Sequence, residues 1–364
     1  MKIAVIAHSL YPIKEPFEGG LEMVTYLLCR SLIERGHLVD LYARHGSDPT
    51  LDPINIPTDR LYPSDFLKEV SDFGRNTSEV KEMMAYSQIM DRIAKGGYDI
   101  VHNHSLHYIP IMMGNAIDVP MLTSIHTPPF TYLQIGAYAV RKAVDQTFTM
   151  VSSSLAETWS HIVPNAEVVH NGIDLSMWDF VPTDRREYLF WYGRICPEKG
   201  THLAIEAARW AGMEIRLAGP ISNRDYYDEK VMPLLHYKNI KYLGHLSQKE
   251  LVPMLGNATA MLFTSTWEEP YGLTLAESLA CGTPVIAFDG GATREILSRR
   301  TGIIVPMEDT VAMSEAIGEI GSIERADCRE RAEKRCSHQV MVQNYLDLYD
   351  GLLERREYLK YQVS

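Results

Sequence analysis

The chain has 364 residues, which at about 150 residues per domain suggests two domains. Hydrophobic residues make up 46% of it and aromatic residues 9%, so a disordered chain is excluded. The formal charge is −12 at pH 7 and the sequence has no long run of Lys or Arg. An acidic chain of this kind repels phosphate polymers, so nucleic acid is not an expected partner.

The five cysteines are widely spaced and form no CxxC pair. This pattern argues against a disulfide framework and against a structural zinc site, and favours a reducing, cytoplasmic location. The N-terminal apolar run ends before His8 and is too short for a signal peptide. No stretch approaches the roughly 20 apolar residues that cross a bilayer, although peripheral membrane contact stays open.

Short apolar runs alternate with longer amphipathic segments in the first half of the chain. A helix is expected over Leu21–Glu34, and mixed charge with helical spacing predicts helix within 57–97. The strands are expected at Ile3–Ala7, Leu38–Ala43, Ile100–His102, Met121–Ile125 and Thr147–Ser152. Such alternation predicts a parallel sheet with crossover helices.

The same pattern begins again after about residue 180. The expected strands are Tyr188–Tyr192, Ile215–Ala218, Ile240–Leu243, Met261–Thr264 and Val285–Phe288. The expected helices are Gly200–Gly212, Lys249–Leu255 and Leu273–Ala280. Asp179–Arg186 reads as a linker and Val340–Leu353 as an amphipathic segment. Two doubly wound α/β domains are therefore predicted.

Two glycine-containing turns are candidate anion sites. Gly19 and Gly20 precede the first helix, where backbone N–H groups could approach a phosphate, although a plain turn fits equally. The residues that follow do not form a GxGxxG fingerprint. In the second turn, Arg194 and Lys199 follow a buried strand, the place where open α/β sheets bind ligands. Two cations there suit a diphosphate, and two solvated charges remain the alternative.

The most informative segment runs from Trp267 to Glu277. Gly272 opens a helix, so its first N–H groups can face an anion. Glu269 and Glu277 would repel a phosphate directly, but each could accept hydrogen bonds from a sugar hydroxyl beside it. The alternative is an acidic residue at a helix start and an exposed helix glutamate.

Five motifs together resemble the retaining GT-B glycosyltransferases of family GT4. They are the two glutamates separated by seven residues, the GR-x3-EKG turn, the N-terminal Gly-Gly, His126-Thr127-Pro128 and Asn171-Gly172-Ile173-Asp174. The resemblance covers nearly the whole chain. It implies an α/β fold of two facing Rossmann-like domains with a deep interdomain cleft. The acceptor-side domain would be 1–178, joined by a terminal helix at about 345–364 that crosses back to it, and the donor-binding domain would be 179–344.

The resemblance also implies roles for individual residues. Arg194 and Lys199 would bind the diphosphate, Glu269 a hydroxyl of the donor sugar and Glu277 the ribose. His126 would lie near the donor sugar, and His126, Arg194, Lys199 and Glu269 form the expected catalytic set. The remaining donor contacts would come from Gly19, Gly20, Gly193, His245, Leu246, Gly272, Leu273 and Thr274, with the base near His245 and Leu246.

The implied activity is transfer of a hexosyl group, glucose being the first choice, from a nucleoside-diphosphate sugar to a hydroxyl acceptor with retention. UDP is the first choice of nucleotide, GDP and ADP being the alternatives, and neither a metal nor another cofactor is expected. A sugar-nucleotide epimerase and a non-catalytic sugar-nucleotide-binding protein are the rival readings.

Acceptor contacts are expected from Tyr11, His104 and Phe130, which lie on loops of the first domain. A small molecule, a glycan or a natural product would each fit as acceptor, and the lack of a polybasic run favours a small molecule over a membrane lipid. The sequence does not decide between a monomer and a homodimer.

Overall fold

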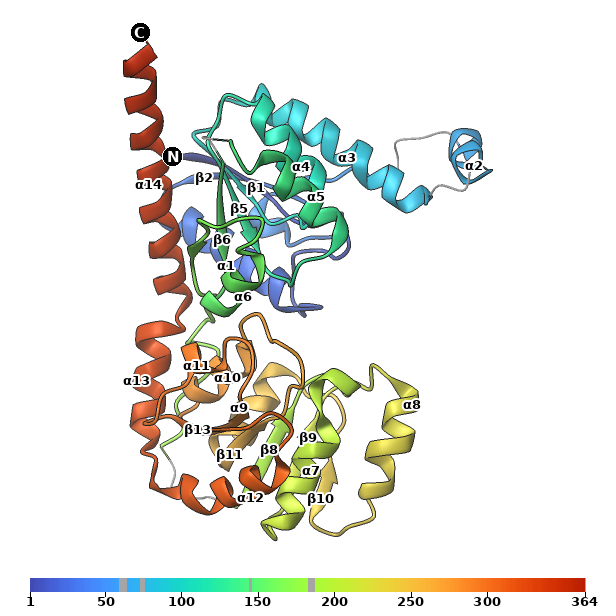
Figure 1. The fold of residues 1–364 in the computed structure, drawn as a ribbon, viewed down its shortest axis with the longest axis vertical. Coiled ribbons are helices and arrows are strands. Elements are labelled where there is room, and N and C mark those ends of the chain that lie inside the picture. The colour runs from blue at the N-terminus through green and yellow to red at the C-terminus, as the bar shows by residue number, and fades with distance from the viewer. Residues whose placement is uncertain (59–63, 73–75, 144–145, 183–186, 364) are drawn as a thin grey trace. The chain divides into compact units, whose positions relative to one another are not determined.

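The structure is a computed structural model that describes residues 1–58, 64–72, 76–143, 146–182 and 187–363. The chain forms two compact units. Unit 1 comprises Met1–Val169 and Met341–Ser364, and unit 2 comprises His170–Val340. Figure 1 shows one parallel sheet in each unit, with helices on both of its faces.

The sheet of unit 1 has the strand order β3-β2-β1-β4-β5-β6-β7, and all its pairs are parallel. Its strands are β1 (Lys2–Ile6), β2 (Leu38–Ala43), β3 (Ile54–Asn55), β4 (Ile100–Asn103), β5 (Met121–Ile125), β6 (Gln146–Met150) and β7 (Glu167–Val168). Its helices are α1 (Gly20–Glu34), α2 (Ser64–Asp72), α3 (Thr77–Ala94), α4 (Tyr108–Met113), α5 (Thr131–Val140), α6 (Ser153–Trp159) and most of α14 (His338–Val363).

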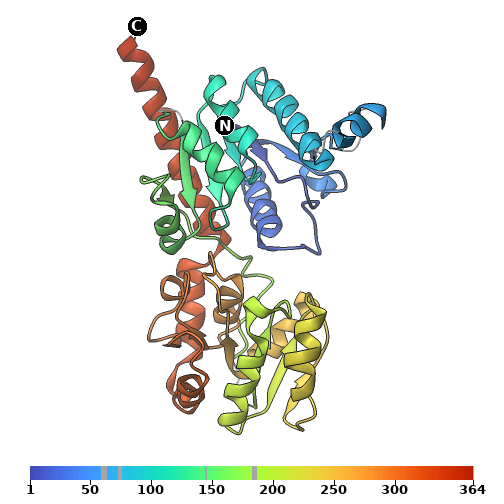
Figure 2. The same cartoon turned by 45° about the vertical axis from the view of Figure 1, so that its right-hand side comes forward.

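Strand β1 shows why both faces of this sheet are covered. Ile3 and Val5 join one apolar cluster, which includes the buried side of α1 and of α14. Ala4 and Ile6 join a second cluster, which includes the buried side of α3. Alternate residues of a strand point to opposite faces, so a continuous apolar run requires helices on both sides. Figure 2 shows α2 away from this sheet, beyond the start of α3.

The sheet of unit 2 has the order β10-β9-β8-β11-β12-β13 and is also parallel. Its strands are β8 (Tyr188–Tyr192), β9 (Ile215–Ala218), β10 (Ile240–Tyr242), β11 (Ala258–Phe263), β12 (Val285–Phe288) and β13 (Gly302–Val305). Its helices are α7 (Thr201–Trp210), α8 (Arg224–Tyr226), α9 (Gln248–Gly256), α10 (Leu273–Ala280), α11 (Thr293–Ile296), α12 (Thr310–Glu319) and α13 (Arg325–Arg335).

The division between the units lies at 169/170, nine residues before the boundary expected at 178/179. Two backbone hydrogen bonds explain the difference. The Ile173 amide donates to the Cys336 carbonyl over 2.8 Å, and the His338 amide donates to the Ile173 carbonyl over 2.9 Å. A Cβ on Gly172 would lie 2.4 Å from the Cα of His338, so only glycine permits this approach. The segment is therefore part of unit 2. Of the expected linker Asp179–Arg186, residues 183–186 lie outside the described residues, as do 59–63 and 73–75 of the expected helical region.

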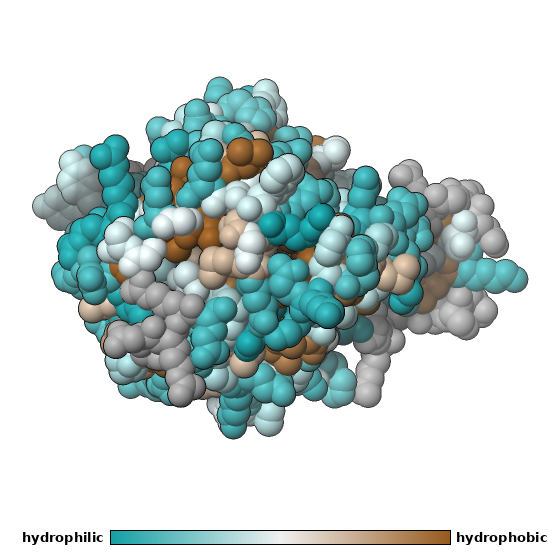
Figure 3. Space-filling view, turned by 90° about the horizontal axis from the view of Figure 1, so that it is seen from below, coloured by the Kyte–Doolittle hydropathy of each residue, from teal (hydrophilic) through white to brown (hydrophobic). Residues whose placement is uncertain are grey.

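The surface is mainly polar on the face that Figure 3 shows, where hydrophobic residues form small separate areas. Within the described ranges, no helix is both long enough and apolar enough to cross a membrane. All five cysteines are buried and unpaired with one another.

A buried polar network fastens α14 to the sheet of unit 1. His102 Nδ1 lies 2.5 Å from the Tyr349 hydroxyl, and its Nε2 lies 2.7 Å from the Ser124 hydroxyl. Ser124 also lies 3.0 Å from the Tyr345 hydroxyl and 2.7 Å from that of Thr149. Burial lowers the pKa of His102 well below its ordinary value, so the ring is neutral and serves as one donor and one acceptor.

Removing the Tyr349 hydroxyl should therefore destabilise unit 1. Tyr349→Phe leaves one nitrogen of His102 buried without its partner, at a cost of about 1–3 kcal/mol. Thermal unfolding followed by circular dichroism should show a midpoint several degrees lower. Tyr358→Phe, at an exposed position of the same helix, is the control and should leave the midpoint unchanged. Equal midpoints for the two variants would contradict the role given to the network.

Candidate functional site

The candidate donor site of unit 2 lies where its strand order reverses direction. Strand β8 has β9 and β10 on one side and β11, β12 and β13 on the other. The carboxyl ends of β8 and β11 therefore mark the switch point, where such sheets usually bind ligands. The two loops contain the predicted residues from Gly193 to Lys199 and from Glu269 to Gly272, and α10 begins directly after them with Leu273 and Thr274.

Three glycines allow the loop after β8 to pack tightly. Gly193 has a φ of +156°, and a Cβ on Gly219 would lie 1.8 Å from the Gly193 carbonyl oxygen. Gly200 has a φ of +60°, and a Cβ there would lie 2.3 Å from the carbonyl oxygen of Thr264. Side chains are excluded at these contacts because the backbones meet directly. The turn is thus held against the neighbouring loop and against the end of β11.

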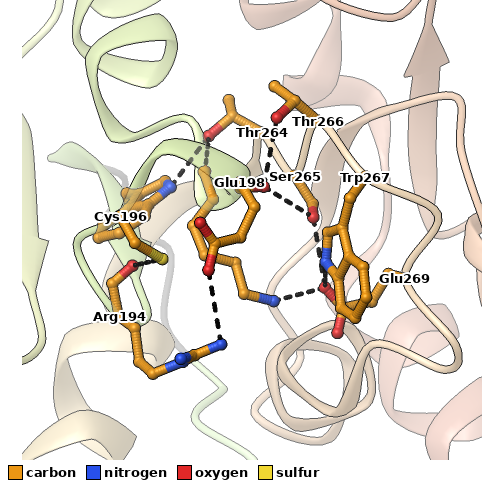
Figure 4. Close-up of polar contacts among 10 residues, drawn as sticks. Arg194, Cys196, Glu198, Thr264, Ser265, Thr266, Trp267 and Glu269 are labelled. Carbon is orange, nitrogen blue, oxygen red and sulfur yellow. Dashed lines mark hydrogen bonds and ion pairs between the residues drawn. The ribbon is translucent and has the colours of Figure 1, made fainter. Parts of the chain in front are cut away.

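Lys199 and Glu269 form an ion pair that joins the two loops (Figure 4). The same carboxylate oxygen accepts a hydrogen bond of 2.9 Å from Trp267 Nε1 and one of 3.3 Å from the Ser265 hydroxyl. Both partners of the pair are largely buried, with side chains 20% and 17% exposed. The structure therefore brings a cation and a hydroxyl-accepting carboxylate together at the switch point.

Arg194 stands in the same turn but makes only a loose contact. Its Nη2 lies 3.8 Å from Glu198 Oε1, and its side chain is 57% exposed. An exposed ion pair at this distance contributes little to stability. Backbone hydrogen bonding, a hydrogen bond with Cys196 and the nearby cations lower the pKa of Glu198 below its ordinary value, although burial opposes the shift. The guanidinium of Arg194 is free to turn toward an anionic ligand at modest cost.

The start of α10 presents backbone N–H groups at the same switch point. Gly272 has a φ of +87°, a conformation that L-residues rarely adopt, and immediately precedes Leu273. The first N–H groups of an α-helix have no partner within the helix. Those of Leu273 and Thr274 are therefore available to an anion, and the helix dipole adds about 0.3–1 kcal/mol in favour of negative charge.

Glu277 lies one turn further along α10 and is tied to β8 by Tyr192. The Tyr192 hydroxyl donates to Glu277 Oε2 over 2.5 Å and lies 3.2 Å from the Thr274 carbonyl oxygen. Burial raises the pKa of Glu277 to about 7, and the hydrogen bond from Tyr192 opposes that rise. The carboxyl group therefore titrates near neutral pH, with one oxygen occupied and one left for a ligand hydroxyl.

The residues expected at the base lie further along the same edge. His245 and Leu246 follow β10, two strands away from β8. His245 is exposed and Leu246 is half-buried. Among the described contacts, no hydrogen bond links either of them to the loops after β8 and β11. Their role at the base therefore stays a prediction.

Unit 1 has its own switch point, between β1 and β4. Gly19 caps α1, Gly20 is its first residue, and a Cβ on Gly19 would lie 3.0 Å from Glu22 Oε2. His8 Nε2 lies 2.6 Å from Glu22 Oε1, and both side chains are only 6% exposed. Burial raises the pKa of Glu22, but contact with His8 outweighs it and leaves the pKa below its ordinary value. A buried carboxylate thus stands directly behind the glycine pair.

His126 follows β5 and reaches the same region of unit 1. Its Nε2 lies 2.9 Å from Nδ1 of His104. Burial lowers the pKa of His126 to about 3, helped by His8, while Glu22 opposes the shift. His126 is therefore neutral at pH 7, a state that suits a hydrogen bond to a hydroxyl better than attraction to a phosphate.

Two of the three expected acceptor contacts line a cavity in unit 1. Tyr11 and Phe130 stand at its wall, and the cavity has a volume of about 360 Å³. His104 does not line it. The His104 amide continues the β1–β4 ladder by donating to the Ile6 carbonyl, and its ring is fully buried between His102 and His126. Strand pairing carries His104 below the surface and away from this cavity, and its expected acceptor contact stays a prediction.

Several residues of the site were not predicted. Tyr192 and the His8–Glu22 pair act through contacts with residues distant in sequence, which no local pattern indicates. Gly291 packs directly against Glu269, since a Cβ added to Gly291 would lie 2.2 Å from the Glu269 carbonyl oxygen. The Gly291 amide donates to the Glu268 carboxylate. The adjacent Gly290 and Gly291, which follow a buried strand, form a sequence pattern that could have indicated this close contact. Within the described residues, no group of three His, Cys, Asp or Glu is placed to hold a metal ion.

Comparison with known proteins identifies the family. Residues 18–177 match the family model described as Glycosyltransferase Family 4, and residues 174–335 match that described as Glycosyl transferases group 1. The chain belongs to the GT4 family of glycosyltransferases. This glycosyltransferase is 24% identical over 362 residues to glycogen synthase of Mycobacterium tuberculosis (strain CDC 1551 / Oshkosh), covering 87% of the chain and 85% of the relative.

Two further comparisons place the glycosyltransferase among relatives of varied activity. It is 25% identical over 360 residues to D-inositol 3-phosphate glycosyltransferase of Pseudarthrobacter chlorophenolicus, covering 84% of the chain and 83% of the relative. The crystal structure of Anabaena HepE in complex with UDP-glucose matches with a TM-score of 0.69 at 16% identity, covering 96% of this chain and 100% of that one. That likeness establishes the shared GT-B fold.

The raised pKa of Glu277 predicts a pH-dependent effect on stability. The pKa is 4.5 ordinarily and about 7 in the folded glycosyltransferase, so folding favours the protonated form. The stability that this proton contributes is complete below about pH 4.5 and is lost as the pH rises through about 7. Glu277→Gln carries no charge, so it should raise the unfolding free energy by roughly 1–3 kcal/mol at about pH 8 and by far less at about pH 5.

Thermal unfolding at both pH values checks this expectation. Glu319→Gln, which removes an exposed carboxylate from α12, is the control and should leave both midpoints unchanged. A Glu277→Gln variant that loses stability at both pH values would show that the buried carboxylate is not a cost to the fold.

Proposed function

We propose that this glycosyltransferase moves a hexosyl group from a nucleoside-diphosphate sugar to a hydroxyl of its acceptor, with retention at the anomeric carbon and without a metal ion. UDP-glucose is the first donor to test, because Anabaena HepE, which has the same fold, forms a complex with it. The observation that carries the proposal is the convergence of Lys199, Glu269 and the start of α10 at one switch point.

The cationic side of this site suits the diphosphate. Lys199 and the open N–H groups of Leu273 and Thr274 lie on neighbouring loops, and the exposed guanidinium of Arg194 can turn toward them. Negative charge develops on the diphosphate as it leaves, so donors that are already in place lower the barrier most. A diphosphate that contacts Lys199 shares this cation with Glu269.

The carboxylates of the site suit the two sugars. Glu269 already accepts hydrogen bonds from Trp267 and Ser265, and a donor-sugar hydroxyl can join this set. Glu277 keeps one oxygen for the ribose while Tyr192 holds the other. In unit 1, neutral His126 is suited to a hydrogen bond with a hydroxyl, and the start of α1 at Gly19 and Gly20 has backbone N–H groups without helical partners.

The reaction balances with no covalent enzyme intermediate. The bond between the anomeric carbon and the β-phosphate oxygen breaks, and a bond to the acceptor oxygen forms on the same face of the sugar. The acceptor proton passes to an oxygen of the departing phosphate. The products are the nucleoside diphosphate and a glycoside with its original anomeric configuration.

Incubation with labelled sugar nucleotides tests the reaction class. UDP-, GDP- and ADP-sugars are supplied with and without hydroxyl acceptors, in the presence of EDTA. A glycoside with retained configuration, assigned by proton NMR, is the expected product, and EDTA should not reduce its yield. An inverted product would refute the front-face route, an isomerised sugar nucleotide would indicate an epimerase, and binding without turnover would indicate a non-catalytic protein.

Substitution of the two cations tests the diphosphate site. Lys199→Ala and Arg194→Ala should each lower kcat by about 10²-fold or more, because each removes stabilisation of the leaving group. Arg300→Ala removes an exposed arginine that pairs with Asp327, so it serves as the control for Arg194 and should keep normal kcat. Near-normal turnover in both Lys199→Ala and Arg194→Ala would remove the basis for the assigned roles.

A further inference from the structure

Carboxylates dominate the charged lining of the cavity of unit 1. Its lining includes three carboxylates, on Glu22, Glu79 and Glu82, and none of its lining residues is Lys or Arg. His8 also lines the cavity and pairs with Glu22 over 2.6 Å, while Arg44, whose Nη1 donates to the Ser9 carbonyl over 2.9 Å, does not line it. Glu79 and Glu82 are therefore the carboxylates that meet a molecule entering the cavity.

Two of these carboxylates repel each other. Glu79 and Glu82 are three residues apart on α3, a spacing that puts both on one face of the helix. Burial raises the pKa of Glu82 and the charge of Glu79 raises it further, while His8 and Arg44 oppose the shift. A bound cation between these two groups would relieve the repulsion, whereas a bound phosphate would add to it.

Much of the remaining wall of the cavity is aromatic. The ring of Tyr108 is stacked with those of His107 and Tyr132, with centroids 4.6 Å and 5.8 Å apart. Tyr11, Phe130 and Tyr132 are 46%, 41% and 51% exposed, although each lines the cavity. Burial lowers the pKa of His107 to about 4, so this ring adds no positive charge. Such a wall suits the C–H face of a saturated ring and, through cation–π attraction, an ammonium group.

We propose that this cavity binds the acceptor, and that the acceptor is a hydroxyl-bearing ring that carries a protonated amine and no phosphate. Its ammonium group lies between Glu79 and Glu82, and its ring lies against Tyr108 and Tyr132. The volume of about 360 Å³ is at the small end of the roughly 300–1,000 Å³ range of ligand pockets, which fits one or two rings. The proposal rests on the proposed function. The proposed acceptor carries no phosphate, unlike the compound after which the relative D-inositol 3-phosphate glycosyltransferase is named.

Saturation-transfer NMR on the full chain tests the proposal, since it detects weak ligands through their ring C–H protons. The probes are glucosamine, glucose and glucose 6-phosphate at equal concentration. Glucosamine should give the strongest signal, at least about threefold above glucose, and glucose 6-phosphate the weakest. The Glu79→Gln/Glu82→Gln variant should lose the difference between glucosamine and glucose, and Tyr132→Ala should weaken both signals.

Asp91→Asn is the matched control, because it removes an exposed carboxylate from the same helix outside the cavity. It should keep the preference for glucosamine. The proposal is overturned if glucosamine gives no signal, if glucose 6-phosphate equals or exceeds glucose, or if the double variant keeps the amine preference. UDP binding measured by calorimetry on the same samples separates the two levels: intact UDP binding with any of these results refutes the acceptor class and leaves the proposed donor chemistry standing.

Discussion

The contact between Lys199 and Glu269 is the interaction on which the candidate donor site depends. It joins the loop after β8 to the loop after β11, the two loops that diverge where the strand order reverses. Glycines let the backbones come close enough for this contact. Gly200 lets the loop after β8 approach Thr264, and Gly291 lets the loop after β12 pack against Glu269. Without a ligand the carboxylate neutralises the lysine. We expect Lys199 to contact the diphosphate of a bound donor while Glu269, next to it, accepts a hydrogen bond from a sugar hydroxyl.

Glu277 illustrates the conflict between a binding site and a stable fold. Its carboxyl group is buried by α10 and β8, and this burial raises its pKa to about 7. A hydrophobic residue would pack there at no electrostatic cost, but it could not accept hydrogen bonds from a diol. Tyr192 reduces the cost with a short hydrogen bond, and its own hydroxyl is held by the turn of helix that carries Glu277. Substitution of a residue that supports a functional group in this way should disturb the site as much as substitution of a residue that contacts the ligand.

Much of the fold could be predicted because buried strands are continuous apolar runs. Leu38–Ala43, Met121–Ile125, Tyr188–Tyr192, Leu273–Ala280 and Val285–Phe288 have the predicted bounds. The two-residue strands β3 and β7 lie at sheet edges and are too short to leave a pattern, and β13 was also missed. The proximity of candidate site residues was predictable where they share one loop, as Arg194 and Lys199 do. The support of Glu277 by Tyr192 was not predictable because it depends on tertiary pairing, and neither was the burial of His104 by strand pairing.

The two units differ in the charge that they offer to small molecules, although the whole chain is acidic. At its switch point unit 2 has Arg194, Lys199 and the open N–H groups of α10, and its carboxylates there are paired or hydrogen-bonded. Unit 1 has three carboxylates around an aromatic cavity and histidines that burial keeps neutral. An anionic donor and a cationic acceptor would each be repelled by the other unit's site. Opposite charge would therefore sort the two substrates before any specific contact forms, since electrostatic attraction acts at longer range than hydrogen bonding.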